Sequence, residues 1–480
     1  MSNHLYIGSS EVDVTPDKSV ILGGATISGK IRVDAIKDPL YAKTLIIRSN
    51  QRQLCIISLD LLMITKRYVE LIRDEAERRW GFERDAIMIH ATQNHKSPSL
   101  GHFKISDTYK GIPADLDWVR GGDEGFHAYA FKQIIDSIET AYHSMIPVEM
   151  GAASGIEGRV AFNRRMIMRD GSASMPSKSG PPQPHSRYLE GPIDPELGVV
   201  CFRELQQIAA SGAEQGSDRD QDLKQDSQPS SQQIRALLLS YTCHPVHEIT
   251  KFFISADWPG ALSDQMKERL GGPCTPLVLN GACGNINPWD PYAEKPNDDA
   301  QYTGNILADT ACKVIEGITF SDEAVLDWKI KRIQIPLRHM DETEVANAKQ
   351  YLADNPIPKW LDEVVLDDKW VYASGLVDLY EQYERQPLYD YEVQVLRIGD
   401  AAFVGLPGEP FAETGMEIKL ASPAYPTYIV HNTQFAGYIP TKEAFPHGGY
   451  ETTTSNWSKF VPEAADMIAA ASLELLRELF

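Results

Sequence analysis

Short apolar runs alternate with amphipathic stretches along most of the chain, a pattern that predicts strands alternating with helices. We expect strands at Thr44–Ser49, Leu54–Leu59, Ala86–His90, Leu197–Phe202, Arg235–Thr242, Pro276–Asn280, Glu392–Ile398, Ala401–Leu406 and Tyr428–His431. Three-to-four spacing of apolar residues, as at Val69, Ile72 and Ala76, predicts amphipathic helices. The expected helices are Lys66–Trp80, Ala128–Ser144, Leu262–Leu270, Thr303–Glu316 and Pro462–Leu479.

This alternation indicates an α/β architecture. Very short links join some neighbouring strands, as between Ser49 and Leu54, and such links predict antiparallel hairpins. The sheets should therefore be mixed. We predict one domain over residues 1–480. Ala209–Gln233 is rich in Ser, Gln, Asp and Gly between two predicted strands, so we expect a disordered insertion in a hairpin.

Composition narrows the possible partners. Apolar residues make up 42% and charged residues 24% of the 480 residues, which is typical of a globular protein. The net charge of −21 argues against binding to nucleic acid or to anionic membranes. No apolar run approaches the roughly 20 residues of a membrane span, and no signal peptide is visible. The six cysteines lack CxxC spacing, so we expect buried free thiols and a cytoplasmic protein.

Polar residues follow several of the predicted strands. Two imidazoles, a carboxylate and a phenol at strand ends, brought together, would make a metal site with N and O ligands, which suits zinc. These four groups belong to His95, His244, Glu409 and Tyr438, and Gln93 lies two positions before His95. Each has an ordinary alternative, because the histidines can be structural, Glu409 can cap a helix and a tyrosine can lie on the surface. The glycine-spaced loop Asn280–Pro288 could offer N–H groups to an oxyanion.

A longer set of motifs extends over nearly the whole chain. In order, they are Asp13-Val14-Thr15-Pro16, Ala91–Pro98, Gly158-Arg159, Asn163-Arg164, Gly191–Glu196, His244-Pro245, Ser255–Gly260, Gly284–Pro288, Pro407-Gly408-Glu409, Gly437-Tyr438 and Tyr450-Glu451. This ordered set resembles the neutral/alkaline non-lysosomal ceramidases, a family of zinc-dependent amidases. The resemblance implies a catalytic domain of mixed sheets flanked by helices. We expect a relative without the secretion signal and C-terminal β-sandwich domain of full-length members.

The resemblance also implies a site. The family's four zinc ligands fall on Gln93, His244, Glu409 and Tyr438, and a second histidine that lines the reaction site falls on His95. The active-site arginine and the second tyrosine of the family fall on Arg164 and Tyr450.

Two positions depart from the family pattern. Gln93 stands where the family has its first metal histidine, and an amide oxygen is a poor zinc ligand. Either His95 takes over coordination, or the metal site is weakened, altered or lost. Asn287 stands where ceramidases carry a serine, so ceramide itself is a doubtful substrate.

We therefore expect a zinc-dependent hydrolase that cleaves an amide-type bond in a soluble, polar small molecule. His95 or Tyr450 would exchange protons, and Arg164 would steady the developing oxyanion. A second hypothesis is a polysaccharide lyase or glycosidase that acts on an oligosaccharide-sized ligand, since Trp289 and Asp290 suit a hydrophilic partner. A third is a ligand-binding protein without catalysis.

Overall fold

The computed structural model describes residues 4–17, 20–24, 28–30, 32–175, 185–205, 233–295 and 297–480. Of the predicted insertion Ala209–Gln233, all but Gln233 lies outside the described residues. None of the helices in the described ranges is long and apolar enough to cross a membrane.

The larger of two main sheets has eight strands in the order β14-β12-β11-β6-β1-β3-β4-β5. They are β1 (Leu5–Asp13), β3 (Tyr41–Ser49), β4 (Arg52–Leu59), β5 (Ile87–Ala91), β6 (Ile146–Ile156), β11 (Glu196–Glu204), β12 (Ile234–Tyr241) and β14 (Thr275–Asn280). The pairs β4–β5 and β12–β14 are parallel and the other neighbours are antiparallel, so the predicted mixed sheet is confirmed.

The second sheet has four strands in the order β16-β17-β18-β20. They are β16 (Leu326–Pro336), β17 (Leu388–Ile398), β18 (Ala401–Gly405) and β20 (Thr427–Val430), and only β18–β20 is parallel. Three short pairs are β2 (Ala35–Ile36) with β13 (Phe253–Ile254), β7 (Phe162–Asn163) with β15 (Ile286–Asn287), and β19 (Glu409–Pro410) with β21 (Tyr438–Ile439). A small three-stranded sheet has the order β10 (Ser186–Leu189), β8 (Met166–Met168) and β9 (Ala173–Ser174).

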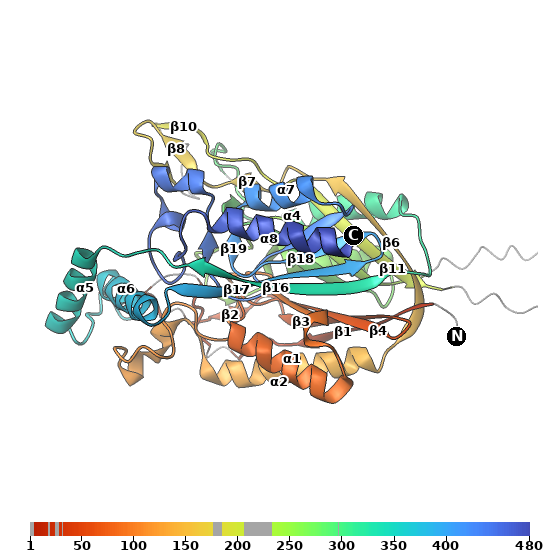
Figure 1. Cartoon of the computed structure of the whole chain (residues 1–480), viewed down its shortest axis with the longest axis horizontal. Helices are drawn as coiled ribbons and strands as arrows, with labels where there is room; N and C mark the ends of the chain where they lie inside the picture. Colours follow the sequence, from red (N-terminus) through yellow and green to blue (C-terminus); the bar gives the residue numbers. More distant parts are fainter. Residues whose placement is uncertain are drawn as a thin grey trace, which may run out of the picture.

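The two sheets face one another between outer helices (Figure 1). The alternation of side chains along each strand builds the layers: Leu45 and Ile47 of β3 pack toward the second sheet, whereas Ile46 packs toward the helices. One outer layer consists of α1 (Lys66–Trp80), α2 (Glu124–Tyr142), α3 (Asp257–Leu270) and α4 (Ala300–Glu316). The other consists of α7 (Ala412–Ala421) and α8 (Ala464–Leu479).

A smaller helical unit lies at one end of the sheets (Figure 1). Here α5 (Glu342–Asp354) and α6 (Asp368–Arg385) pack on the segment that contains Ile105 and Leu116. Short 3₁₀ turns are η1 (Arg84–Ala86), η2 (Ala114–Arg120), η3 (Lys442–His447) and η4 (Tyr450–Thr452).

The α/β prediction is confirmed, and α1 has the predicted bounds. The pattern of the sequence missed β1, β6 and β16 and the helices α5 and α6. Strand β6 contains Pro147 and two glycines, and β16 alternates charged with apolar residues at the edge of its sheet, so neither reads as an apolar run. All six cysteines are free thiols, and only Cys312 is not fully buried.

Candidate metal and catalytic site

The carboxyl ends of strands from both sheets meet in one region. The backbone N–H of His431, directly after β20, donates to the carbonyl of Asn280 at the end of β14, at 3.0 Å. The N–H of Ala91, at the end of β5, donates to the carbonyl of Asn432 at 3.4 Å. Loops that follow these strands therefore converge, as is common where α/β sheets bind ligands.

The short parallel pair β19–β21 places Glu409 beside Tyr438. The two residues are paired in register, and the N–H of Glu409 donates to the carbonyl of Gly437 at 2.9 Å. Gly408 has φ of +72°, and a Cβ there would lie 2.3 Å from the Gly437 carbonyl oxygen. The Pro-Gly-Glu motif thus needs its glycine for this close approach of two backbones.

His244 reaches Glu409 from the end of β12. Its Nδ1 donates to the carbonyl of Cys283 at 2.6 Å, so in the neutral ring Nε2 carries a lone pair. This Nε2 lies 3.2 Å from Oε2 of Glu409, and both residues are buried. Two acceptor atoms this close require a positive centre, either a proton or a metal ion. Glu409 does not cap α7, because α7 begins after Phe411 without a side-chain cap.

His95 presents a second lone pair to the same region. Its Nδ1 donates to the carbonyl of Gly24 at 2.9 Å, and its ring centre lies 5.7 Å from that of His244. Burial, and then the charge of His244, lower the pKa of His95 to about 4, so its ring is neutral at pH 7. Within the described chain, its buried Nε2 has no hydrogen-bond partner.

Gln93 donates a hydrogen bond to the carboxylate of Glu409. A carboxylate only accepts hydrogen bonds, so the hydrogen bond between the two side chains uses the Gln93 amide N–H. The amide oxygen lies 4.0 Å from Sγ of Cys283. The backbone of Gln93 is left-handed, with φ of +64°, which turns the chain between β5 and His95.

Burial opposes the negative charge of Glu409, but His244, Gln93 and Arg164 together hold the pKa of its carboxyl below the usual range. The carboxylate is therefore ionised at neutral pH. Burial, and then the charge of Glu409, raise the pKa of the Tyr438 phenol well above its usual range. The site thus combines an anionic oxygen with a neutral phenol.

A buried ion-pair network holds Arg164 against this site. Its Nε donates to Oε1 of Glu451 at 2.8 Å, and one terminal nitrogen donates to Oδ1 of Asn287 at 3.4 Å. Arg165 binds the other oxygen of Glu451 at 2.7 Å. The Arg164 guanidinium also lies 5.4 Å from the ring centre of Tyr438. Its remaining terminal nitrogen is buried and has no partner among the described residues.

A cavity of about 320 Å³ opens beside Glu409. Its walls are mainly apolar and aromatic, with a few polar groups. They are formed by Gly23, Gly24, Leu62, Met63, Gln93, His95, Phe103, Lys104, Glu409, Phe435, Tyr438, Tyr450 and Trp457. The ring of Tyr450 lies 5.6 Å from that of Tyr438 and is stacked on Trp457 at 6.4 Å.

Seven of the predicted site residues lie together: His244, Glu409, Tyr438, His95, Gln93, Arg164 and Tyr450. Asn287 contacts the site through its hydrogen bond with Arg164. Trp289 and Asp290 do not line the cavity. The loop after β14 offers fewer N–H groups than the sequence suggested, because those of Gly281, Gly284 and Ile286 donate to carbonyls of the fold.

No sequence motif marked Phe103, Lys104, Phe435 or Trp457 as cavity residues. Burial lowers the pKa of Lys104 to about 7, so this ammonium can lose its proton near neutral pH. These residues lie outside the family motifs and between predicted elements, and no local pattern marks them. Glu451 was visible in the Tyr450-Glu451 motif, but its role as the partner of two arginines was not.

No family model matches the chain, and no curated protein sequence matches it. Comparison with solved structures gives a clear result for the fold. The structure of neutral ceramidase from Pseudomonas aeruginosa matches with a TM-score of 0.69 at 16% identity, over 100% of this chain and 75% of that chain. A ceramidase complexed with C2 matches with a TM-score of 0.68 at 15% identity and the same coverages. This chain has the neutral-ceramidase fold. The resemblance seen in the sequence motifs is confirmed at the level of the fold.

Proposed function

We propose that the protein is a metal-dependent hydrolase that cleaves an amide-type bond in a compact soluble substrate. The main support for this proposal is the distance of 3.2 Å between His244 Nε2 and Glu409 Oε2. His95, whose Nε2 has no partner among the described residues, lies next to His244 in the same buried region. When the His244 ring is neutral, the three buried acceptor atoms have no donor, which is costly, and a bound cation would satisfy all of them.

The donor set suits zinc. Two ligands roughly 2.05 Å from a tetrahedral zinc ion lie about 3.3 Å apart, close to the separation of His244 and Glu409. Tyr438, paired with Glu409 in register, would supply a phenol oxygen, and His95 would supply a further nitrogen. Gln93 would support the metal indirectly, because it orients Glu409 through its amide N–H. When bound, such an ion polarises a carbonyl and lowers the pKa of water.

The chain's own residues supply the remaining functions. The unpartnered terminal nitrogen of Arg164 can donate to an oxygen that gains negative charge during attack. Glu451 and Asn287 hold this guanidinium in place, so it does not need to reorganise. Tyr450 lines the cavity, and burial together with the charge of Glu409 raises the pKa of its phenol above the usual range. It therefore keeps its proton at neutral pH and can give it to a leaving group.

The cavity guides the choice of substrate. A volume of about 320 Å³ lies at the lower end of ligand-binding pockets, which run from roughly 300 to 1,000 Å³. Its apolar walls suit a short acyl group, whereas Lys104 and Glu409 suit a polar part of the same molecule. We therefore propose a small soluble amide with a short acyl chain, in preference to a lipid with two long chains.

The test is amide hydrolysis by the full chain supplied with Zn²⁺. Release of amine is measured over a series of N-acyl substrates from acetyl to palmitoyl, for the unmodified protein and for His244→Asn. We expect zinc-dependent turnover of the shorter substrates and its loss in the variant. An unmodified protein that binds zinc but leaves every amide intact contradicts the proposal.

One observation favours carbohydrate processing as the second candidate. Tyr450 and Trp457 are stacked with their ring planes 24° apart, and both line the cavity, where they could support the flat face of a sugar ring. Oligosaccharides belong in the same screen. Cleavage of a glycosidic bond, with no amide cleaved, favours this candidate, and ligand binding without turnover favours a non-catalytic protein.

A further inference from the structure

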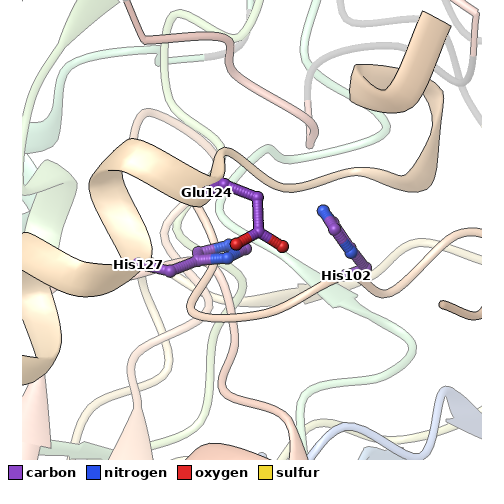
Figure 2. Close-up of side chains that lie close together, drawn as sticks. All are labelled: His102, Glu124 and His127. Atoms are coloured by element: carbon purple, nitrogen blue, oxygen red, sulfur yellow. The ribbon is translucent and has the colours of Figure 1, made fainter. Parts of the chain in front are cut away.

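A second group of metal-binding side chains lies outside the site described above. His102, on the loop after β5, meets Glu124 and His127 from the first turns of α2. One donor atom from each residue lies within 4.8 Å of the other two. Figure 2 shows the three side chains pointing toward one another, with the carboxylate between the two rings in this view. Glu124 and His127 are three positions apart, so they project from the same face of the helix.

The hydrogen bonds of His102 prepare one of its nitrogens for a ligand. Its Nδ1 binds the carboxylate of Asp107, and because a carboxylate only accepts, Nδ1 carries the proton. Nε2 of the neutral ring is then a lone-pair donor. The arrangement of carboxylate, imidazole and open nitrogen is common around metal ions, because it fixes the ring and its tautomer.

The same nitrogen has no hydrogen bond. Nε2 of His102 is buried and without a partner in the described part of the chain. Oδ2 of Asp117 lies 3.8 Å away, too far for a hydrogen bond, and it offers a further carboxylate oxygen nearby.

His127 is buried with 2% of its surface exposed, and its Nε2 likewise has no partner among the described residues. The two ring centres are 5.3 Å apart with near-perpendicular planes. Side-chain packing alone leaves these two buried imidazole nitrogens, which lie beside a carboxylate, without a hydrogen-bond partner, and this is energetically costly.

The backbone makes room for this cluster at Gly122. A Cβ at this position would lie 2.7 Å from Cδ2 of His102 and 2.8 Å from Nε2 of His127. Glycine therefore allows the two rings to approach one another. The N-terminal position of Glu124 is stabilising through the helix dipole alone, but that effect does not account for the two unpartnered imidazoles.

We propose that His102, Glu124 and His127 form a second site, which binds a divalent transition-metal ion such as Zn²⁺. Two imidazole nitrogens and one carboxylate oxygen are a known zinc ligand set. The site would fasten the loop after β5 to the start of α2. The same loop carries Phe103 and Lys104, which line the cavity and whose N–H groups donate to the carbonyl of Arg120 at 3.0 and 2.9 Å. A metal here would hold the cavity wall in place, whatever reaction the neighbouring site performs.

The test is calorimetric titration of Zn²⁺ into the metal-free full chain. The Glu409→Gln background weakens the other candidate site. In this background we compare Glu124→Gln with Glu139→Gln, a control that removes an exposed carboxylate from the same helix. Because Glu124 is itself exposed, its isosteric replacement leaves the fold intact. We expect Zn²⁺ binding in the background and in the control, weakened about tenfold or more by Glu124→Gln. Replacing Zn²⁺ by Co²⁺ should give a visible absorption band that Glu124→Gln alters and Glu139→Gln does not.

Equal affinity in the Glu124→Gln and Glu139→Gln proteins overturns the proposal, as does the absence of Zn²⁺ binding in the Glu409→Gln background. Failure of the proposed hydrolase gives a different result. In that case amide turnover is absent, while the loss of Zn²⁺ affinity on Glu124→Gln remains.

Discussion

Nε2 of His244 and Oε2 of Glu409 face each other at 3.2 Å in a buried site, although neither atom can donate a hydrogen bond to the other when the ring is neutral. Cys283 fixes this arrangement, because its carbonyl accepts from the opposite nitrogen of the ring. The two atoms are therefore positioned to bind the same cation.

Glu409→Gln should affect the stability of the protein differently without and with bound metal. The glutamine amide can donate to His244, so the metal-free variant should be at least as stable as the metal-free unmodified protein. With zinc at 100 times its dissociation constant, the unmodified site should gain about 2.7 kcal/mol, and the variant much less. Thermal unfolding in a Glu124→Gln background measures this site alone. Equal zinc stabilisation of both proteins argues against Glu409 as a ligand.

Gln93→His should tighten zinc binding. The side chain already contacts Glu409, and an imidazole there would add a nitrogen ligand where the amide contributes only a hydrogen bond. Histidine also tolerates the left-handed backbone of this position better than most residues do. We expect a gain of about tenfold or more, the scale of metal-site substitutions, in competition with a chelator. An unchanged or lower affinity shows that position 93 lies out of reach of the metal.

Glu451→Gln should destabilise the protein by about 3–5 kcal/mol, because it leaves Arg164 and Arg165 buried without their shared carboxylate. Urea unfolding measures the loss. Glu443→Gln, whose side chain is 70% exposed, is the control and should change stability by less than about 0.5 kcal/mol.

The same substitution has a predictable pH dependence. Burial opposes the charge of Glu451, but Arg164 and Arg165 hold its pKa below the ordinary 4.5. The stabilisation is therefore fully present above about pH 4.5 and is lost as the pH falls through the folded-state pKa. Between neutral pH and strong acid, Glu451→Gln should lose less stability than the unmodified protein. Parallel pH curves for the two proteins would show that this carboxyl is not ionised in the fold.

Long-chain ceramide should be hydrolysed slowly or not at all. The cavity of about 320 Å³ has no room for two long chains, and Asn287 has no hydroxyl but accepts a hydrogen bond from Arg164. Turnover of a fluorescent ceramide by the zinc-loaded protein is compared with that of Asn287→Ser. Efficient cleavage by the unmodified protein would restore ceramide as the substrate.

Removal of residues 209–232 should change stability little. The N–H of Glu204 donates to the carbonyl of Gln233 at 3.0 Å, so the two strand ends are already joined where the shortened hairpin would close. Loop length itself alters the free energy by only about 0.6 kcal/mol per doubling. Thermal unfolding of the deletion variant tests this, and a fall of about five degrees or more would correspond to several kcal/mol and show that the segment packs on the body.

The sequence alone determined the elements whose pattern is local. The periodicity of Lys66–Trp80 marks one helix, and the apolar runs of β4, β12 and β14 mark buried strands, because side-chain direction repeats with the backbone. His244 and Glu409 were found because each follows such a run. Their motifs can be recognised in the sequence without knowing which residues contact them.

Only the tertiary structure decided which distant groups meet. Strand β1 is recognisable as a strand chiefly because it lies between β6 and β3 in the large sheet. Gln93 became a donor to Glu409, and His102 met His127, through the packing of loops that have no repeating pattern. The physical reason is that local periodicity depends on the backbone alone. The orientation and protonation of a buried polar side chain depend on every group that replaces water around it.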